Sequence, residues 1–122
     1  MKSNLETIKR EARLEEEKAI LRALDIEERF VKSAHGSTFN SSQECYWYLK
    51  EEYQETAEKM DLSHNAVESL WHLIRADDYS GQASSLIYLE QEMFDVVFEA
   101  LQTIAMIRKF KRTVFEMPRA EL

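Results

Sequence analysis

The chain has 122 residues, of which 44% are hydrophobic, enough to build the core of one ordinary domain. Its two glycines and single proline exclude most turn-rich β architectures and favour long helices. Sixteen Lys and Arg residues against 23 Asp and Glu residues give a net charge of -7, which disfavours nucleic acid as a partner because a polyanion would be repelled.

The chain shows no pattern of a secreted or membrane protein. Cys45 is the only cysteine, so an internal disulfide is excluded. The first ten residues are charged and lack the apolar centre of a signal peptide, and the longest apolar runs have only four or five residues. We therefore expect a cytoplasmic protein that has no membrane partner.

The spacing of apolar residues predicts an all-α fold, an antiparallel bundle of about four helices. The first helix covers residues 4–30. After a connection at residues 33–41, Asn40 or Ser41 is expected to cap a second helix that ends near Asp61. A third helix at residues 63–76 closes at the polar stretch 77–81, and a fourth covers residues 83–110. We expect a single domain, 1–122, with an N-terminal amphipathic helix (1–32), a helical core (39–110) and a tail (111–122) that frays.

The fourth predicted helix is apolar on two sides. One stripe includes Leu86, Met93 and Ala100, and a second includes Phe94 and Phe98. Each apolar stripe needs a covering surface, so the second stripe predicts association with further copies of the chain. We expect a homodimer or a homotetramer.

Two acidic pairs border the apolar faces of their helices. Glu52 and Glu55 lie three residues apart on the second predicted helix, and Glu92 and Asp95 do so on the fourth. At 100° per residue, Glu52 and Glu92 each lie about 90° from the centre of the nearby apolar face. If the two helices are neighbours, four carboxylates converge, and a cation is needed to neutralise them. An all-oxygen ligand set suits Mg²⁺ or Mn²⁺.

The same acidic motifs carry a family resemblance. The run from Phe39 to Glu55 contains E-E-x-x-E at residues 51–55, and E-x-x-D follows at residues 92–95. This order resembles the MazG-like all-α nucleoside triphosphate pyrophosphohydrolases, in particular the small members found in phages and prophages. The resemblance covers residues 39–110, and 36 residues separate Glu55 from Glu92.

The resemblance implies a fold, an activity and a site. It implies a MazG-like bundle that hydrolyses a nucleoside triphosphate, NTP or dNTP, to the monophosphate and pyrophosphate with Mg²⁺ or Mn²⁺ as cofactor. Glu52, Glu55, Glu92 and Asp95 match the metal-binding positions, and Glu51 matches the leading acid of the first motif, which positions or activates water.

Three alternatives accompany this hypothesis. The acidic residues can form a solvated surface, because nearly one residue in five is acidic. A second alternative is a non-catalytic, phage-derived MazG-like interaction or assembly protein that uses its apolar stripe at Phe94 and Phe98. A carboxylate di-iron bundle is disfavoured because no E-x-x-H motif occurs. A basic cluster at residues 108–112, which includes Lys109, either complements the helix dipole or binds phosphate.

Overall fold

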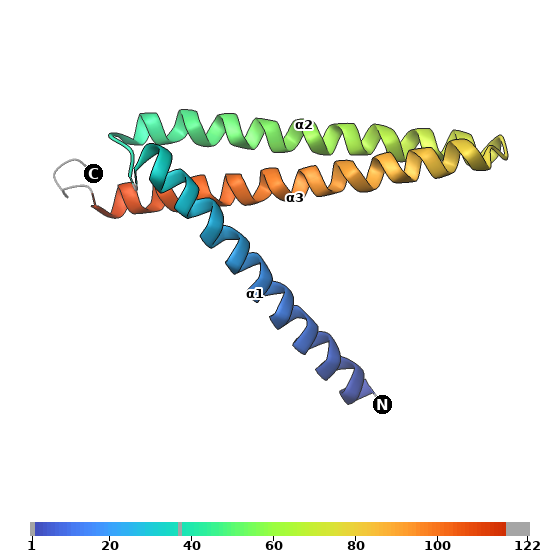
Figure 1. Cartoon of the computed structure of the whole chain (residues 1–122), viewed down its shortest axis with the longest axis horizontal. Coiled ribbons are helices and arrows are strands. Elements are labelled where there is room, and N and C mark those ends of the chain that lie inside the picture. Colours follow the sequence, from blue (N-terminus) through green and yellow to red (C-terminus); the bar gives the residue numbers. More distant parts are fainter. Residues whose placement is uncertain (1, 37, 117–122) are drawn as a thin grey trace. The chain divides into compact units, whose positions relative to one another are not determined.

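The computed structural model describes residues 2–36 and 38–116, without the side chains of residues 2, 3, 34 and 35. These residues form three helices, α1 (Lys2–His35), α2 (Ser42–Arg75) and α3 (Tyr79–Glu116) (Figure 1). The all-α prediction is confirmed. The predicted count of four helices is wrong, because the second and third predicted helices are one continuous helix, α2.

The predicted break near Asp61 does not form because nothing there prevents helical geometry. The stretch contains neither glycine nor proline, and the Ser63 hydroxyl donates a hydrogen bond to the Met60 carbonyl oxygen at 2.7 Å. This contact satisfies the buried serine side chain inside the helix instead of capping a new one. Asp61, Leu62 and Ser63 therefore all lie in the middle of α2.

The chain divides after residue 37 into two units. The first unit contains α1, whose exposed surface carries ion pairs within the helix, such as Arg13 with Glu17 at 3.3 Å and Arg29 with Asp25 at 2.7 Å. Each pair of this kind contributes about 0.3–0.5 kcal/mol to a helix. The second unit is the antiparallel hairpin of α2 and α3, which lie side by side over their length (Figure 1). The division of the chain into one domain with a helical core at residues 39–110 stays a prediction.

The hairpin begins at a well-defined cap. The Ser41 hydroxyl accepts a hydrogen bond from the Glu44 amide at 3.1 Å, which confirms the expected cap position.

Just before this cap, the Phe39 amide donates to the Thr113 hydroxyl at 2.8 Å, and the Phe39 ring stacks on Tyr48 with 5.1 Å between the ring centres. Lys109 is fully buried, with its ammonium 3.8 Å from the centre of the Phe39 ring. Its burial lowers the pKa of Lys109. The chain entering α2 is thus attached to the end of α3.

The predicted tail falls partly inside α3. Residues 111–116 continue the helix, and the Thr113 side chain is buried. The rest of the tail, residues 117–122, lies outside the described residues. None of the helices in the described part of the chain is long and apolar enough to cross a membrane.

A tight turn at residues 76–78 joins α2 to α3. Asp77 adopts a left-handed conformation with φ of 52°, and the Asp78 amide donates to the Leu73 carbonyl oxygen at 3.0 Å. The Asp78 carboxylate then accepts a hydrogen bond from the Gly81 amide at 2.8 Å, which caps α3. A Cβ atom at Gly81 would lie 2.5 Å from Asp78 Oδ2 and 2.8 Å from Leu73 Cδ2. A Cβ atom at position 81 therefore requires the Asp78 carboxyl group and the end of the Leu73 side chain to move.

We predict that Gly81→Ala lowers the free energy of unfolding by about 1–3 kcal/mol, since the added methyl group displaces the Asp78 cap and presses on Leu73. Urea unfolding followed by circular dichroism measures the change. Ser84→Ala is the matched control, because Ser84 is exposed one turn further along α3. Equal stability of the Gly81→Ala variant and the wild type would contradict the close packing of this turn.

Candidate functional site

The contact between α2 and α3 follows a repeat of alternating three- and four-residue steps, which we call the hairpin seam. All of its residues are buried or half-buried. The seam consists of Cys45, Leu49, Glu52, Thr56, Lys59, Ser63, Ala66, Leu70 and Leu73 on α2 and of Gln82, Ser85, Leu89, Glu92, Val96, Glu99, Thr103, Met106, Phe110 and Thr113 on α3.

The middle of the hairpin seam is polar. Seven of the eight seam residues there, from Glu52 to Ser63 on α2 and from Glu92 to Thr103 on α3, are polar or charged, and Val96 is the exception. Apolar residues such as Leu49, Phe110 and Leu73 occupy its two ends. A polar centre stabilises a helix pair little, because burying charge costs free energy. The centre of the seam therefore contributes less to the packing of the two helices than its ends do.

The turn decides which residues of the two helices face each other. Residues equally distant from Asp77 along the chain lie at the same level of the hairpin. Glu55 and Glu99 are each 22 residues from Asp77, and the pair of Lys59 with Asp95 is 18 residues away on both sides. Lys59 Nζ and Asp95 Oδ2 lie 4.0 Å apart, in agreement with this register.

Three carboxylates meet at the level of Glu55. One oxygen from each of Glu52, Glu55 and Glu99 lies within 4.8 Å of the others. We call this cluster the glutamate triad. Glu99 Oε2 is buried and accepts no hydrogen bond from the described residues. The triad combines two residues that the sequence predicted as metal ligands with one, Glu99, that it did not.

Two threonines fix the backbone beside the glutamate triad. The hydroxyl oxygens of Thr56 and Thr103 lie 3.0 Å apart across the hairpin seam. The Thr103 hydroxyl is also 2.9 Å from the Glu99 carbonyl oxygen and 3.3 Å from that of Glu52. Because these oxygens belong to the two residues that supply seam carboxylates, the threonine pair holds both helices in register at the triad.

Electrostatics at the glutamate triad favour a proton or a cation. Burial raises the pKa of Glu55, and so do the charge of Glu99 and a hydrogen bond shared with it. The charges of Glu51 and Glu58 raise this pKa further. Each cause penalises the ionised carboxylate, and a divalent cation between the carboxylates would remove the repulsion.

The remaining predicted residues lie elsewhere. Glu92 is 15 residues from Asp77 and Glu55 is 22, so Glu92 lies seven residues, about 10 Å, further along the hairpin than the glutamate triad. Glu92 is 8% exposed, and its buried Oε2 accepts no hydrogen bond within the described residues. Asp95 pairs with Lys59 and accepts a hydrogen bond from Gln91 Nε2 at 3.3 Å. Glu51 is exposed next to the triad. Metal binding by Glu52, Glu55, Glu92 and Asp95, and the role of Glu51, stay predictions.

Comparisons of the chain with protein-family models, with curated proteins and with solved structures find no match. The described residues form an all-α structure with an acidic cluster. The resemblance to a family is supported only by the two acidic motifs.

We predict that Glu55→Gln raises the melting temperature at neutral pH by about 1–3 °C, because it removes an ionised carboxylate whose pKa is raised in the folded state. With a folded pKa above the unfolded one, the wild type loses stability as pH rises between the two values. The gain from Glu55→Gln should therefore vanish below about pH 4, where the carboxyl is protonated in both states.

Thermal unfolding from pH 3.5 to 8 in a chelating buffer tests this prediction. Glu90→Gln, an exposed site on α3, is the matched control and should change the melting temperature equally little at every pH. A Glu55→Gln effect that did not depend on pH would argue against repulsion in the glutamate triad.

Proposed function

We propose that the chain is a metal-dependent nucleoside triphosphate pyrophosphohydrolase, in which the glutamate triad binds Mg²⁺ or Mn²⁺. The observation that supports the proposal is the approach of three carboxylate oxygens to within 4.8 Å of one another. Oxygen ligands from several carboxylates suit these hard cations. The E-E-x-x-E motif, whose second and third acids are Glu52 and Glu55, supports this class of reaction by its resemblance to MazG-like enzymes.

The residues of the hairpin suit this chemistry. A bound divalent ion would neutralise charge on the triphosphate and lower the pKa of an attached water. Attack of water on the α-phosphorus would break its bond to the leaving pyrophosphate and yield the nucleoside monophosphate. Glu51 lies one turn before Glu55, exposed to solvent, and is the carboxylate proposed to accept the proton of the water. Glu52, Glu55 and Glu99 position the ion.

The proposal assigns Glu99 the place that the sequence motif gave to Glu92. This assignment follows the register of the hairpin, in which Glu99 and Glu55 are equally far from Asp77. Glu92 and Asp95 lie on the same helix, one to two turns away, at the level of Lys59 and Ser63. Lys59 already neutralises part of the charge at Asp95, which makes the triad the more strongly acidic of the two places.

We predict that the purified full chain releases pyrophosphate from at least one ribo- or deoxyribonucleoside triphosphate with Mg²⁺ or Mn²⁺. Glu55→Gln and Glu99→Gln should each lower the rate at least about 100-fold, since each removes a charged ligand of the ion. Glu90→Gln should keep the wild-type rate. A coupled pyrophosphate assay over a panel of nucleotides measures all four proteins.

The same assay tests the register. If Glu92→Gln abolishes the release and Glu99→Gln does not, the ion is bound as the sequence motif predicted and not by the glutamate triad. A folded wild type that releases no pyrophosphate from any nucleotide, and binds neither cation in a calorimetric titration, contradicts the enzyme proposal.

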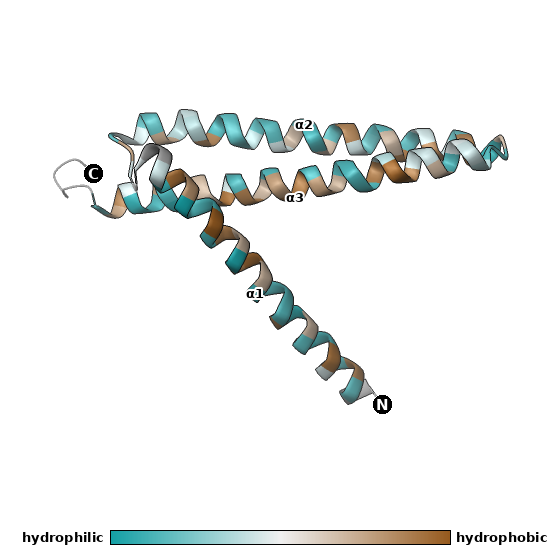
Figure 2. Cartoon of the chain, viewed as in Figure 1, coloured by the Kyte–Doolittle hydropathy of each residue, from teal (hydrophilic) through white to brown (hydrophobic). Residues whose placement is uncertain are grey.

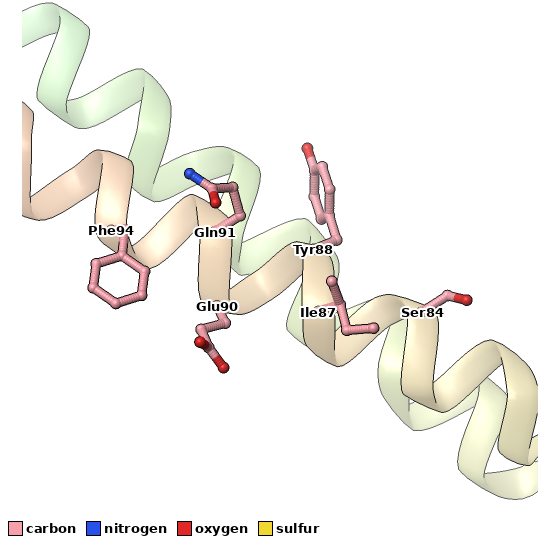
Figure 3. Close-up of a pocket in the computed structure, with 6 residues that line it drawn as sticks. All are labelled: Ser84, Ile87, Tyr88, Glu90, Gln91 and Phe94. Atoms are coloured by element: carbon pink, nitrogen blue, oxygen red, sulfur yellow. The ribbon is translucent and has the colours of Figure 1, made fainter.

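A second candidate function is supported by an exposed apolar stripe on α3. Ile87, Phe94 and Phe98 are 73%, 52% and 56% exposed. In the close-up, Ile87 and Phe94 project from the same helix together with Glu90 and Ser84, and they border a hollow formed by α3 alone (Figure 3). On this alternative the chain is a non-catalytic interaction or assembly protein. It predicts that Phe98→Glu abolishes assembly and that Glu55→Gln has no effect on it.

A further inference from the structure

A second set of ten residues, eight of them exposed, follows the hairpin with a strict seven-residue period. On each helix the set contains the residue directly after a seam residue, as Met60 follows Lys59 and Met93 follows Glu92. None of the ten positions is charged, in a chain of which 32% is charged. We call this set the apolar face. It consists of Tyr46, Tyr53, Met60, Val67 and Ile74 on α2 and of Leu86, Met93, Ala100, Ile107 and Val114 on α3.

The two columns lie on the same side of the hairpin. An antiparallel helix pair has approximate twofold symmetry about an axis perpendicular to the plane of the two helices. Residues that directly follow a seam residue on α2 therefore lie on the same side of the hairpin as those that do so on α3. The columns are also level with each other. Met60 is 17 and Met93 is 16 residues from Asp77. In agreement, Leu49 of the seam lines one hollow together with Ile107 and Val114.

The apolar face is uncovered within the hairpin. Eight of its ten residues are between 40% and 65% exposed, with Tyr53 at the upper limit and Ile107 at the lower. Hydrophobic residues recur along the whole length of both helices (Figure 2). Because the centre of the seam is polar, most of the large apolar side chains of this unit are exposed. Their exposure to water costs free energy.

We infer that a second copy of the chain covers the apolar face, so that two hairpins form a four-helix bundle. A seven-residue period is the pattern by which helices pack over long distances, and it is self-complementary in a twofold dimer. A standard stable interface buries about 800 Å² per partner, and eight apolar side chains that are 40–65% exposed provide apolar surface for one. The absence of charge means that no unpaired ion is buried on association.

This dimer leaves the glutamate triad accessible. Glu55 lies three residues after the seam residue Glu52, on the flank opposite to Tyr53. Asp95 lies on the same opposite flank of α3, and its contact with Lys59 shows that the two acidic flanks adjoin. The apolar face and the acidic side of the hairpin are therefore separate surfaces. The inferred dimer can be tested independently of the proposed activity.

Sedimentation of the full-length chain tests the inference. We expect the wild type to have the mass of two chains of 14.4 kDa at micromolar concentrations. The double variant Met60→Glu with Met93→Glu should raise the dissociation constant at least about 100-fold, because it places two like charges per copy in the interface. Its helicity, measured by circular dichroism, should be unchanged, since both residues are exposed in the hairpin.

Leu62→Glu is the matched control. Leu62 is 43% exposed and lies seven residues after Glu55, on the acidic flank of α2. It adds to α2 the same single charge that Met60→Glu adds there, and the variant should remain a dimer. If the double glutamate variant loses helicity, Met60→Gln with Met93→Gln replaces it, with an expected rise in the dissociation constant of at least about tenfold.

Three results would overturn the inference. The first is a monomeric wild type at about 100 µM. The second is a dimer that neither the glutamate nor the glutamine pair at Met60 and Met93 weakens. The third is a dimer that Leu62→Glu or Phe98→Glu dissociates while the Met60 and Met93 variants stay associated, since contact would then occur through another surface.

Discussion

The turn at Asp77 is the constraint on which the hairpin depends. Its left-handed backbone and the Asp78 cap reverse the chain within three residues, so the register of two helices of 34 and 38 residues is fixed at one end. A helix cannot slide past its partner without breaking these contacts or leaving a loop to absorb the shift. The register brings Glu55 level with Glu99 and brings Lys59 to Asp95. The glutamate triad is thus a consequence of a turn located more than 20 residues away along the chain.

The polar centre of the seam has a second consequence for the whole hairpin. Glutamates at Glu52, Glu92 and Glu99 occupy positions where a stable antiparallel pair would have leucine or alanine. The centre of the contact between the two helices is consequently poor in apolar area, and many large apolar side chains, such as Tyr53, Met60 and Met93, remain exposed. Coverage of its outer surface would add apolar burial that the centre of the seam does not supply. The hairpin thus places carboxylates between its helices and apolar residues on its outer surface.

Contacts at the far end of the hairpin from the turn compensate in part. Phe39 attaches the chain before α2 to Thr113 by a hydrogen bond, and Lys109 contacts the Phe39 ring. Lys109 had been one of four basic residues proposed to complement the helix dipole or to bind phosphate. Its complete burial removes it from any phosphate at the surface. The hydrophobic stem of lysine packs as an apolar side chain would, while its charge is placed over an aromatic ring.

The sequence by itself determined the helical class, a cap at Asn40 or Ser41 and the acidic character of one helix flank. These features depend on local spacing and on residue type, as in the three-residue step from Glu52 to Glu55. The sequence could not determine that α2 continues through Asp61 and Ser63, because serine and aspartate are found both in caps and within helices. Only the tertiary structure decided the register, and with it that Glu99 rather than Glu92 faces Glu55. Register follows from where the chain turns. The sequence predicts a turn at residues 77–81 and also a break near Asp61, and only the continuity of α2 through Asp61 decides which of its residues face α3.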